Sequence, residues 1–456
     1  MSDQNGTQVN TKRRGSRTAN KKNESQVSTL PCPSDDNEGK WIRYWKQQGQ
    51  PWRIKPEINA ERQTYLNERR RRVLNEAGEW IYPLTDVPLS RADIEWLLAT
   101  HANGRGPVDS ADPEQSGRPG LDLCGADLRG VDLRWLPLAH AIFVNAHLEE
   151  AKLYNVHLER ADFNGAHLER ASLDNAYLEG ASLCRAHLEN ASLNYARLEG
   201  AFLLEAHLEG AGLHGVHLEG AKLMNAHLEG AYLNQSFLDV ETDLTNINLF
   251  NQEMGGAILA DVHWGNVDLT VVDNWSTLSI LGDERLARRE VNNGTPESRL
   301  LILGLYRKAT RAYRQLATAL RNQGLNDEAN HFAYYAQLMQ RKVYRLKRHH
   351  WQYFASLVID LLSGYGYKLK RSFRAYLIVI LMFAVAYFII GLTVGPALSP
   401  LGSVVFSMTS FHGRGFFPGG ITLDDPLTVF AAGEAFVGLV IEVTFIATLT
   451  RRLFGG

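Results

Sequence analysis

The chain has 456 residues, and its segments differ in how apolar residues recur along them. From Ala126 to Ala231 a small residue returns at every fifth position apart from Leu136, and a Leu or Phe follows two residues later. A period of five fits neither the 3.6-residue period of a helix nor the two-residue period of a strand. It fits a square coil in which each pentapeptide forms one side, with the small residue and the Leu pointing inward. Such fixed self-similarity predicts a solenoid.

The pattern resembles the pentapeptide-repeat family, whose motif is Ala-(Asp/Asn)-Leu-x-x. The resemblance covers about 23 repeats, with weaker ones from Thr242 to Leu269. It implies a mainly β solenoid, the right-handed quadrilateral β-helix, with four sides per coil and about 4.8 Å between coils. Two departures are informative. Leu136-Pro137-Leu138 puts a bulky residue where Ala is expected, and the register breaks at Asp239–Asp243.

A ten-residue period overlies the five-residue one, which predicts stacked polar side chains on one face of the coil. The expected stacks are His147, His167, His187, His207 and His227, beside Glu149, Glu169, Glu189, Glu209 and Glu229. One interpretation is solvated decoration copied by repeat duplication. The other is a pH-responsive or metal-binding stripe, in which neighbouring histidines oppose and the glutamates favour protonation. His214-x-x-His217 is a weak metal pair, so the sequence assigns no metal ligand and no cofactor.

Non-repetitive segments flank the solenoid. Residues 41–119 include Trp41, Trp45, Trp52 and Trp80, a charged helix-like run over 60–76 and a helix with N-cap Ser90. They are expected to cap the solenoid, since its open end needs covering. Residues 299–321 and 327–347 show helical apolar spacing around a turn at Gln323-Gly324, and resemble one weakly matched tetratricopeptide unit. We expect this hairpin to be a rigid linker between the solenoid and the C-terminal segments.

Two apolar segments near the C-terminus are long enough to cross a bilayer, namely 375–394 and 427–450. Basic residues precede the first and follow the second, which places both outer flanks in the cytoplasm. This predicts a multi-pass protein of the bacterial inner (plasma) membrane, with N- and C-termini cytoplasmic and the connector outside or dipping into the bilayer. His349-His350-Trp351 and the amphipathic run 354–362 are expected near the membrane interface.

The connector carries the candidate functional residues. Ser399-Pro400 is a helix start, 402–410 is a short apolar run, and Gly413-Arg414-Gly415 supplies backbone freedom. Together with the two spans, this resembles the two-transmembrane pore module of potassium channels. The resemblance implies a homotetramer that conducts monovalent ions. It implies a filter made of Thr409, Ser410, Phe411, His412, Gly413, Arg414 and Gly415, and inner-helix pore or gate residues Glu434, Gly438 and Glu442.

Arg414 leaves the selectivity open, because potassium channels have an aromatic residue there. Four guanidiniums on a pore axis would oppose K⁺ and suit anions. If Arg414 instead points into protein, its charge needs a partner, for which Glu434 is one candidate. A potassium-selective pore, a weakly selective or anion-permeable pore and a non-conducting module all remain. The membrane-embedded glutamates are expected to be functional.

Charge is distributed unevenly along the chain, although the net charge is only −2. Residues 121–250 hold 19 acidic against 8 basic residues, and residues 299–374 hold 3 against 15. The basic block next to a span suggests contact with anionic lipid or with the acidic block. Residues 1–40 read as a disordered basic tail.

The expected organisation is tail 1–40, cap 41–119, β-helix 120–280, helical hairpin linker 281–367 and two-transmembrane pore-loop module 368–456. No nucleophile–base pair, phosphate loop or dinucleotide fingerprint points to an enzyme. We predict a pore regulated by the cytosolic solenoid in response to an unknown stimulus, with lipid as partner. The alternative is a membrane-anchored scaffold without conduction. Some pentapeptide-repeat proteins mimic DNA and inhibit gyrase, but membrane attachment and alternating His argue against that role, and no nucleic acid partner is expected.

Overall fold

The computed structural model describes residues 31–70, 73–74, 80–82, 84–115, 117–273, 275, 278, 280–292, 299–393, 398–413 and 426–454. The chain forms two compact units, Met1–Pro56 and Glu57–Gly456. In the first unit, helix α1 (Glu38–Gln47) is capped by the side chain of Asn37. Its tryptophans Trp41 and Trp45 are buried, and the guanidinium of Arg53 lies 3.6 Å from the ring centre of Trp45.

The second unit begins with short elements before the repeats. They are α2 (Ala60–Arg69), β1 (Val73–Leu74), β2 (Trp80–Ile81), α3 (Arg91–Ala99), α4 (His101–Gly104) and η1 (Pro113–Gln115). The helix expected over 60–76 is shorter than predicted, because β1 pairs antiparallel with β2 beyond Arg69. The start of α3 is confirmed, since Ser90 and Asp93 form a reciprocal capping box.

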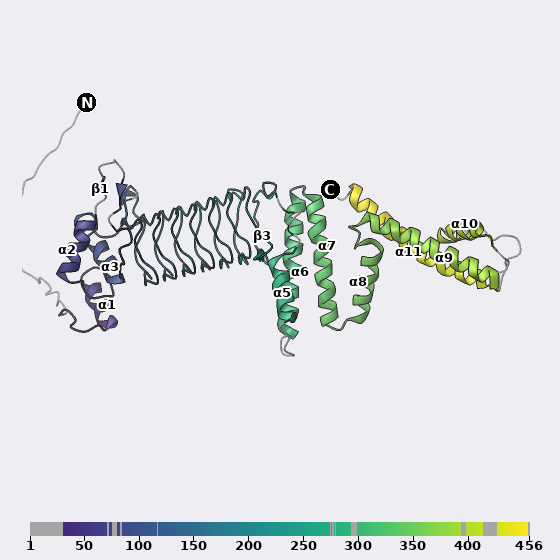
Figure 1. Cartoon of the computed structure of the whole chain (residues 1–456), viewed down its shortest axis with the longest axis horizontal. Helices are drawn as coiled ribbons and strands as arrows, with labels where there is room; N and C mark the ends of the chain where they lie inside the picture. Colours follow the sequence, from purple (N-terminus) through teal and green to yellow (C-terminus); the bar gives the residue numbers. More distant parts are fainter. Residues whose placement is uncertain are drawn as a thin grey trace, which may run out of the picture. The chain divides into compact units, whose positions relative to one another are not determined.

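The repeats form a four-sided parallel β-helix (Figure 1). Parallel bridges join residues twenty positions apart, from Asp122 with Ile142 to His217 with Phe237, so four pentapeptides make one coil. The inward residues are fully buried, with Ala and Leu positions such as Ala166 and Leu168 at 0% exposure. Backbone amides bond to carbonyls of the next coil, which satisfies polar backbone groups along the stack. The square coil inferred from the five-residue period is confirmed.

Each corner of the coil requires a left-handed residue. The last residue of each pentapeptide has φ between 52° and 70°, as in Gly180 and Asn175. This conformation costs an L-residue roughly 1–2 kcal/mol, and Gly or Asn least. Gly and Asn therefore recur at this position of the repeat, although Arg and Glu also occupy it.

The predicted register break is present. Lys222 pairs with Asp243, so that coil has one extra residue, and the carboxylate of Asp239 accepts hydrogen bonds from the amides of Gly220, Glu241 and Thr242. A second insertion forms the small hairpin of β3 (Phe250–Asn251) and β4 (Gly255–Gly256). The stack continues beyond both insertions, so the weaker repeats belong to it.

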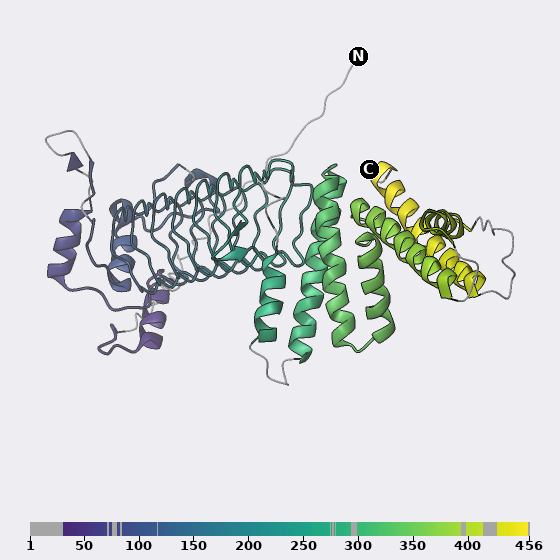
Figure 2. The same ribbon diagram turned by 45° about the vertical axis from the view of Figure 1, so that its right-hand side comes forward.

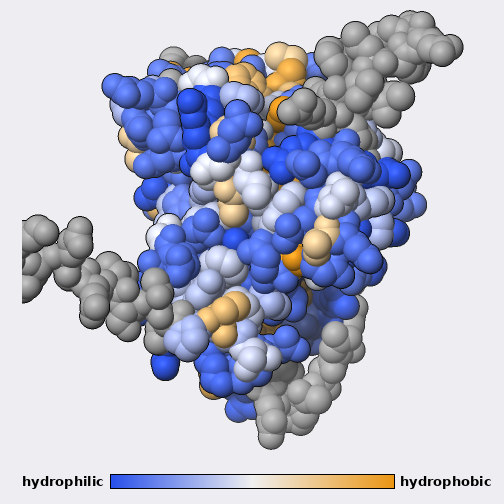
Figure 3. Space-filling view, turned by 90° about the vertical axis from the view of Figure 1, so that its left-hand side faces the viewer, coloured by the Kyte–Doolittle hydropathy of each residue, from blue (hydrophilic) through white to orange (hydrophobic). Residues whose placement is uncertain are grey.

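The N-terminal end of the β-helix is covered by the segment before α3. Pro88 forms a parallel bridge with Asp127, and the Asp86 and Leu89 amides donate to carbonyls of the first coil. Arg91 pairs with Glu95 and Asp132. Figure 3 views the left-hand side of the molecule in Figure 1, and its described surface is mostly hydrophilic with small apolar patches. The paired backbone groups support the predicted capping role for this part of the segment.

The C-terminal end is covered by α5 (Gly282–Asn292) and α6 (Arg299–Asn322). The side-chain amide oxygens of Gln315 on α6 and of Gln323, the residue after its end, accept hydrogen bonds from the Asp261 and Leu269 amides. Asp283 accepts from the Leu259 amide, and its burial raises the pKa of its carboxyl to about 6. The linker is therefore joined directly to the last coil.

The remaining helices continue from this cap (Figure 2). They are α7 (Asn326–Leu346), α8 (His350–Ser363), α9 (Leu369–Thr393), α10 (Pro400–Phe411) and α11 (Pro426–Phe454). Helices α6 and α7 form the expected hairpin, α8 contacts α7, α9 and α11, and α9, α10 and α11 contact one another. Among the described residues, two helical stretches are long and apolar enough to cross a membrane, 369–393 and 427–450.

Candidate functional site

Helix α10 lies between the two long apolar helices, as the sequence predicts. Ser399 caps it by accepting a hydrogen bond from the Gly402 amide, and Pro400 occupies the first turn. With 12 residues it is about 18 Å long, too short to cross a bilayer of about 30 Å. Its serine face, Ser403, Ser407 and Ser410, is buried. Small polar residues at a helix contact let backbones approach closely.

Glu434 lies at the centre of these three helices and is fully buried, at 0% exposure. The hydroxyl of Tyr387 on α9 donates to its Oε2 at 2.6 Å, and the hydroxyl of Ser407 on α10 donates to its Oε1 at 2.5 Å. Ser407 also lies within hydrogen-bond distance of the Ile380 carbonyl. One carboxyl on α11 thus connects all three helices in an otherwise apolar cluster that includes Phe406 and Leu427.

A second polar contact lies at the C-terminal end of α10. His412 Nδ1 contacts the carboxylate of Glu442 on α11, and its Nε2 lies 3.1 Å from the hydroxyl of Tyr376 on α9. The side chains of His412 and Glu442 are each about one-third exposed. This cluster connects the same three helices, and it contains His412 of the predicted filter and Glu442 of the predicted gate.

Gly438 marks the closest approach of α10 to α11. A Cβ atom at this position would meet the carbonyl oxygen of Phe411 at 2.1 Å. By contrast, a Cβ at Gly433 on the same helix would meet nothing within 4 Å. The absence of a side chain at Gly438 therefore allows the end of α10 to rest on α11.

The remaining predicted filter residues fall into two groups. Thr409 donates to carbonyls of its own helix, Ser410 and Phe411 are buried, and Gly413 has φ of 65°. Arg414 and Gly415 lie outside the described residues. The predicted pair of Arg414 with Glu434 therefore stays a prediction. Sequence reasoning missed Tyr387 and Tyr376, which pair with Glu434 and with His412. A tyrosine within an apolar span is the signal that could have identified them.

The outer surface of the three helices α9, α10 and α11, called the α9–α11 hairpin below, is apolar. Many large apolar side chains on α9, α10 and α11 are more than half exposed, for example Leu381 at 62% and Phe436 at 70%. Helix α8 also exposes Trp351, Phe354 and Leu361. Contiguous apolar surface of this kind is typical of contact with lipid or with other protein chains.

Asp360 on α8 joins the linker to the first apolar helix. Its carboxylate accepts from Arg341 of α7 at 2.8 Å and from Arg371 of α9 at 3.1 Å. The Tyr334 hydroxyl of α7 donates to it as well, at 3.1 Å. Three helices therefore meet at one largely buried carboxylate, whose exposed fraction is 14%.

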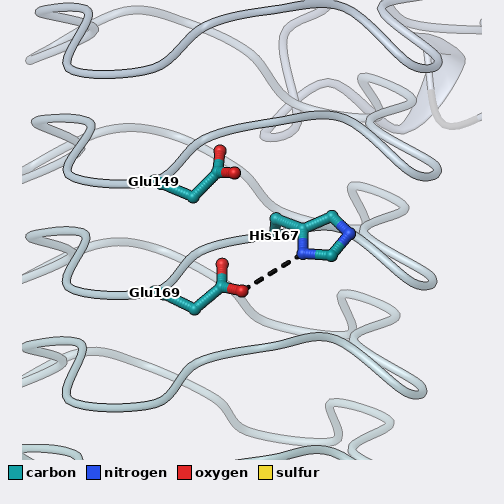
Figure 4. A group of neighbouring side chains, drawn as sticks. All are labelled: Glu149, His167 and Glu169. Carbon is teal, nitrogen blue, oxygen red and sulfur yellow. Dashed lines mark hydrogen bonds and ion pairs between the residues drawn. The ribbon is translucent and has the colours of Figure 1, made fainter.

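The stacked histidines predicted for the β-helix are confirmed. His147, His167, His187, His207 and His227 lie with ring centres 4.9–5.0 Å apart and nearly parallel planes. Each contacts the glutamate two residues later, as His167 does with Glu169 at 3.1 Å (Figure 4). We call this stack, with its glutamates 149, 169, 189, 209 and 229, the long ladder.

A mixed ladder lies two sides further round each coil. It contains His157, Tyr177, Arg197, His217 and Phe237, beside Glu159, Glu179, Glu199 and Glu219. The hydrogen bond with Glu159 raises the pKa of His157. Where Tyr177 replaces the histidine, burial and then the neighbouring carboxylates raise the pKa of Glu179. Burial would raise the pKa of Glu159 as well, but the hydrogen bond with His157 lowers it, so the pKa values of these two carboxyls shift in opposite directions.

The family described as pentapeptide repeats (8 copies) matches this chain over residues 138–170, 171–210 and 203–239. These residues form the coils of the β-helix. The chain therefore carries a pentapeptide-repeat domain, and such repeats imply the right-handed form of the coil. A comparison with curated protein sequences found no match.

Several solved structures are similar over the repeats. Full-length QnrB1, a plasmid-mediated fluoroquinolone resistance protein, is 22% identical, with 36% of this chain and 84% of that chain covered and a TM-score of 0.25. HetL, a pentapeptide repeat protein involved in heterocyst differentiation regulation from the cyanobacterium Nostoc, is 31% identical over 33% and 69%, with a TM-score of 0.14. A pentapeptide repeat protein from the thylakoid lumen of Arabidopsis thaliana is 30% identical over 22% and 69%, with a TM-score of 0.18.

Proposed function

We propose that this chain is a membrane protein whose C-terminal helices form a channel-like pore module, regulated by the pentapeptide-repeat β-helix. The observation that carries this proposal is α10, a short capped helix packed between two membrane-length helices. Non-spanning backbone at membrane depth is tolerated where it is buried in protein or lines water. A membrane anchor alone has no need of such a helix.

A homo-oligomer, in the tetrameric form implied by the potassium-channel resemblance, suits the exposed surface of these helices. One copy of α9–α11 buries polar groups such as Glu434 but exposes most of its apolar side chains. Lipid and neighbouring copies would cover that surface. The basic flanks favour the inner (plasma) membrane, with both termini in the cytoplasm.

Regulation rests on a continuous set of polar contacts. The last coil of the β-helix bonds to Gln315 of α6 and to Gln323 directly after it, and α6 packs on α7. Helix α7 then joins α9 through Asp360. A stimulus that shifts the β-helix would move α9 through these contacts. Its chemical identity is an open part of the proposal.

Ion flux from liposomes containing the full chain tests the channel directly. We expect current in a KCl gradient, and loss of that current in Gly413→Val, because a β-branched residue is strained at φ of 65°. Gly433→Ala is the matched control, since its added Cβ meets no atom within 4 Å. Equal currents in both variants would contradict a filter role for this loop.

The reversal potential distinguishes the forms of the proposal. A value near the K⁺ potential means that Arg414 points away from the pore axis. A value near the Cl⁻ potential, or near zero, means that the guanidinium faces the axis or that the pore is unselective.

A membrane-anchored scaffold without conduction is the second candidate. The observation that favours it is that both glutamates are engaged by side chains of the same copy, Glu434 by Tyr387 and Ser407, and Glu442 by His412. Absence of flux over a wide range of pH, voltage and divalent ions would support this candidate, provided that the protein is inserted and folded.

A further inference from the structure

We propose that the His/Glu ladders of the β-helix bind divalent transition-metal ions such as Zn²⁺, in sites built from one histidine and two glutamates. The two glutamates of a site come from successive coils. One follows the histidine by two residues, and the other precedes it by 18 residues. Figure 4 shows this arrangement for His167, which lies between Glu149 of one coil and Glu169 of the next.

Five groups meet this geometry among the described residues. Their histidines are His167, His187, His207 and His227 on the long ladder and His217 on the mixed ladder. Within each group, one ligand atom from each residue lies within 4.8 Å of the other two. Tetrahedral zinc with bonds of about 2.0–2.2 Å needs its ligand atoms roughly 3.4 Å apart. Side-chain rotations that move the ligand atoms by about 1 Å, within ordinary rotamers, would bring them from 4.8 Å to that separation.

The carboxylates provide a second, independent observation. In all nine ladder glutamates from Glu149 to Glu229, Oε2 is shielded from solvent and accepts no hydrogen bond from the described residues. Glu229 is the strongest case, because its side chain is only 9% exposed. A buried carboxylate oxygen without a partner is costly, and a cation between two such carboxylates removes that cost.

The group of Glu209, His227 and Glu229 is therefore the best-formed site. His227 Nδ1 lies 3.7 Å from Glu229 Oε1 and 3.5 Å from the side-chain amide of Asn248 on the next coil. Imidazole nitrogen with carboxylate oxygen is a donor set that suits zinc. Three protein ligands leave a fourth position for water.

The number of ions that bind is constrained by the spacing. Neighbouring histidines of the long ladder are 4.9 Å apart and share glutamates 169, 189 and 209. If a shared carboxylate serves only one ion, the long ladder holds two ions and the site at His217 holds a third. If carboxylates bridge neighbouring ions, all five sites fill.

The sequence contains its own matched control. His147 and His157 each have the glutamate two residues later, but Arg129 and Ala139 stand where the second glutamate would be. Both histidines are partly exposed and contact that glutamate as the other histidines do, yet they belong to no three-ligand group among the described residues.

The experiment is a titration of the untagged full chain in detergent with Zn²⁺, monitored by calorimetry and by competition with a chromophoric chelator. We expect three to five ions per chain. The variant with histidines 167, 187, 207 and 227 changed to Gln should retain one ion, whereas H147Q/H157Q should bind as many as the unchanged chain. E229Q should weaken the tightest site at least tenfold.

Two results would overturn the proposal. One is saturable binding of less than one ion per chain, and the other is an equal loss of ions in the four-histidine and two-histidine variants. Thermal unfolding in EDTA, followed by circular dichroism, must be unchanged in all variants. This comparison separates the loss of a ligand from the loss of the coil.

Discussion

The β-helix and the α9–α11 hairpin distribute their apolar and polar side chains in opposite ways. In the β-helix the inward Ala and Leu residues are fully buried, and the charged residues point outward. In the hairpin the fully buried side chains include Glu434 and Ser407, while Leu381, Ile378 and Phe436 are more than half exposed. With α9–α11 in a bilayer, as proposed, one physical rule gives both patterns, because the apolar side chains of each region then avoid water.

The two regions also satisfy their buried polar groups differently. The β-helix does so by repetition, since each coil bonds its backbone to the next. The hairpin does so with single side-chain contacts, such as Tyr387 with Glu434. A substitution in one coil therefore affects mainly the coils next to it. A substitution at Glu434 affects three helices at once.

The largest expected effect is a charge placed inside the β-helix. Leu188→Lys buries an unpaired ammonium at a position with 0% exposure, and should cost more than about 4 kcal/mol of unfolding free energy. Chemical denaturation followed by circular dichroism measures this cost. Ser172→Glu, on the outer side of the coil and directly paired with Lys152, should change stability by less than about 0.5 kcal/mol.

A Leu→Lys substitution on α9 tests whether the exposed apolar surface of the α9–α11 hairpin faces lipid. Leu381 is 62% exposed, so Leu381→Lys would be nearly neutral in water. In a bilayer we expect a cost of about 2.5–3.5 kcal/mol, read as loss of membrane insertion in a translocon assay. Leu381→Ala is the control. If the lysine variant inserts normally, or the chain is found in the soluble fraction, α9 does not face lipid.

The buried carboxyl of Asp283, on α5 at the C-terminal end of the β-helix, should make stability depend on pH. The folded pKa of Asp283, about 6, lies above its ordinary value of 3.8, so the folded chain keeps a proton that the unfolded chain has lost between these values. The free energy of unfolding should therefore fall as pH rises from about 4 to about 6, by up to about 3 kcal/mol. Asp283→Asn should lose this component, and an identical pH profile would contradict it.

A smaller effect is expected at the closest helix contact of the hairpin. Gly438→Ala would place a methyl group 2.1 Å from the Phe411 carbonyl oxygen, so α10 must shift at a cost of about 1–3 kcal/mol. Gly433→Ala has open space and should be neutral or slightly stabilising. Thermal unfolding in detergent compares the two. Equal melting temperatures would mean that α10 is only loosely held.

Much of the fold can be predicted from the sequence, because each local signal is repeated or strongly patterned. The five-residue period predicts the coil, the ten-residue period predicts the long ladder, and Ser399-Pro400 predicts the start of α10. The short strand pair after Arg69 was missed, since it depends on a two-residue pairing rather than on helix propensity. The contacts of Glu434 could not be predicted, because they depend on how three helices cross.

The sequence motif is half as long as one revolution of the coil, which limits how this protein can vary in length. The sequence motif repeats every ten residues, whereas one revolution of the coil takes twenty. Duplication of a single motif would turn everything beyond it by half a revolution, and would exchange the long-ladder side for the mixed-ladder side. Relatives that keep both end caps in the same orientation should therefore differ by whole revolutions, in steps of twenty residues.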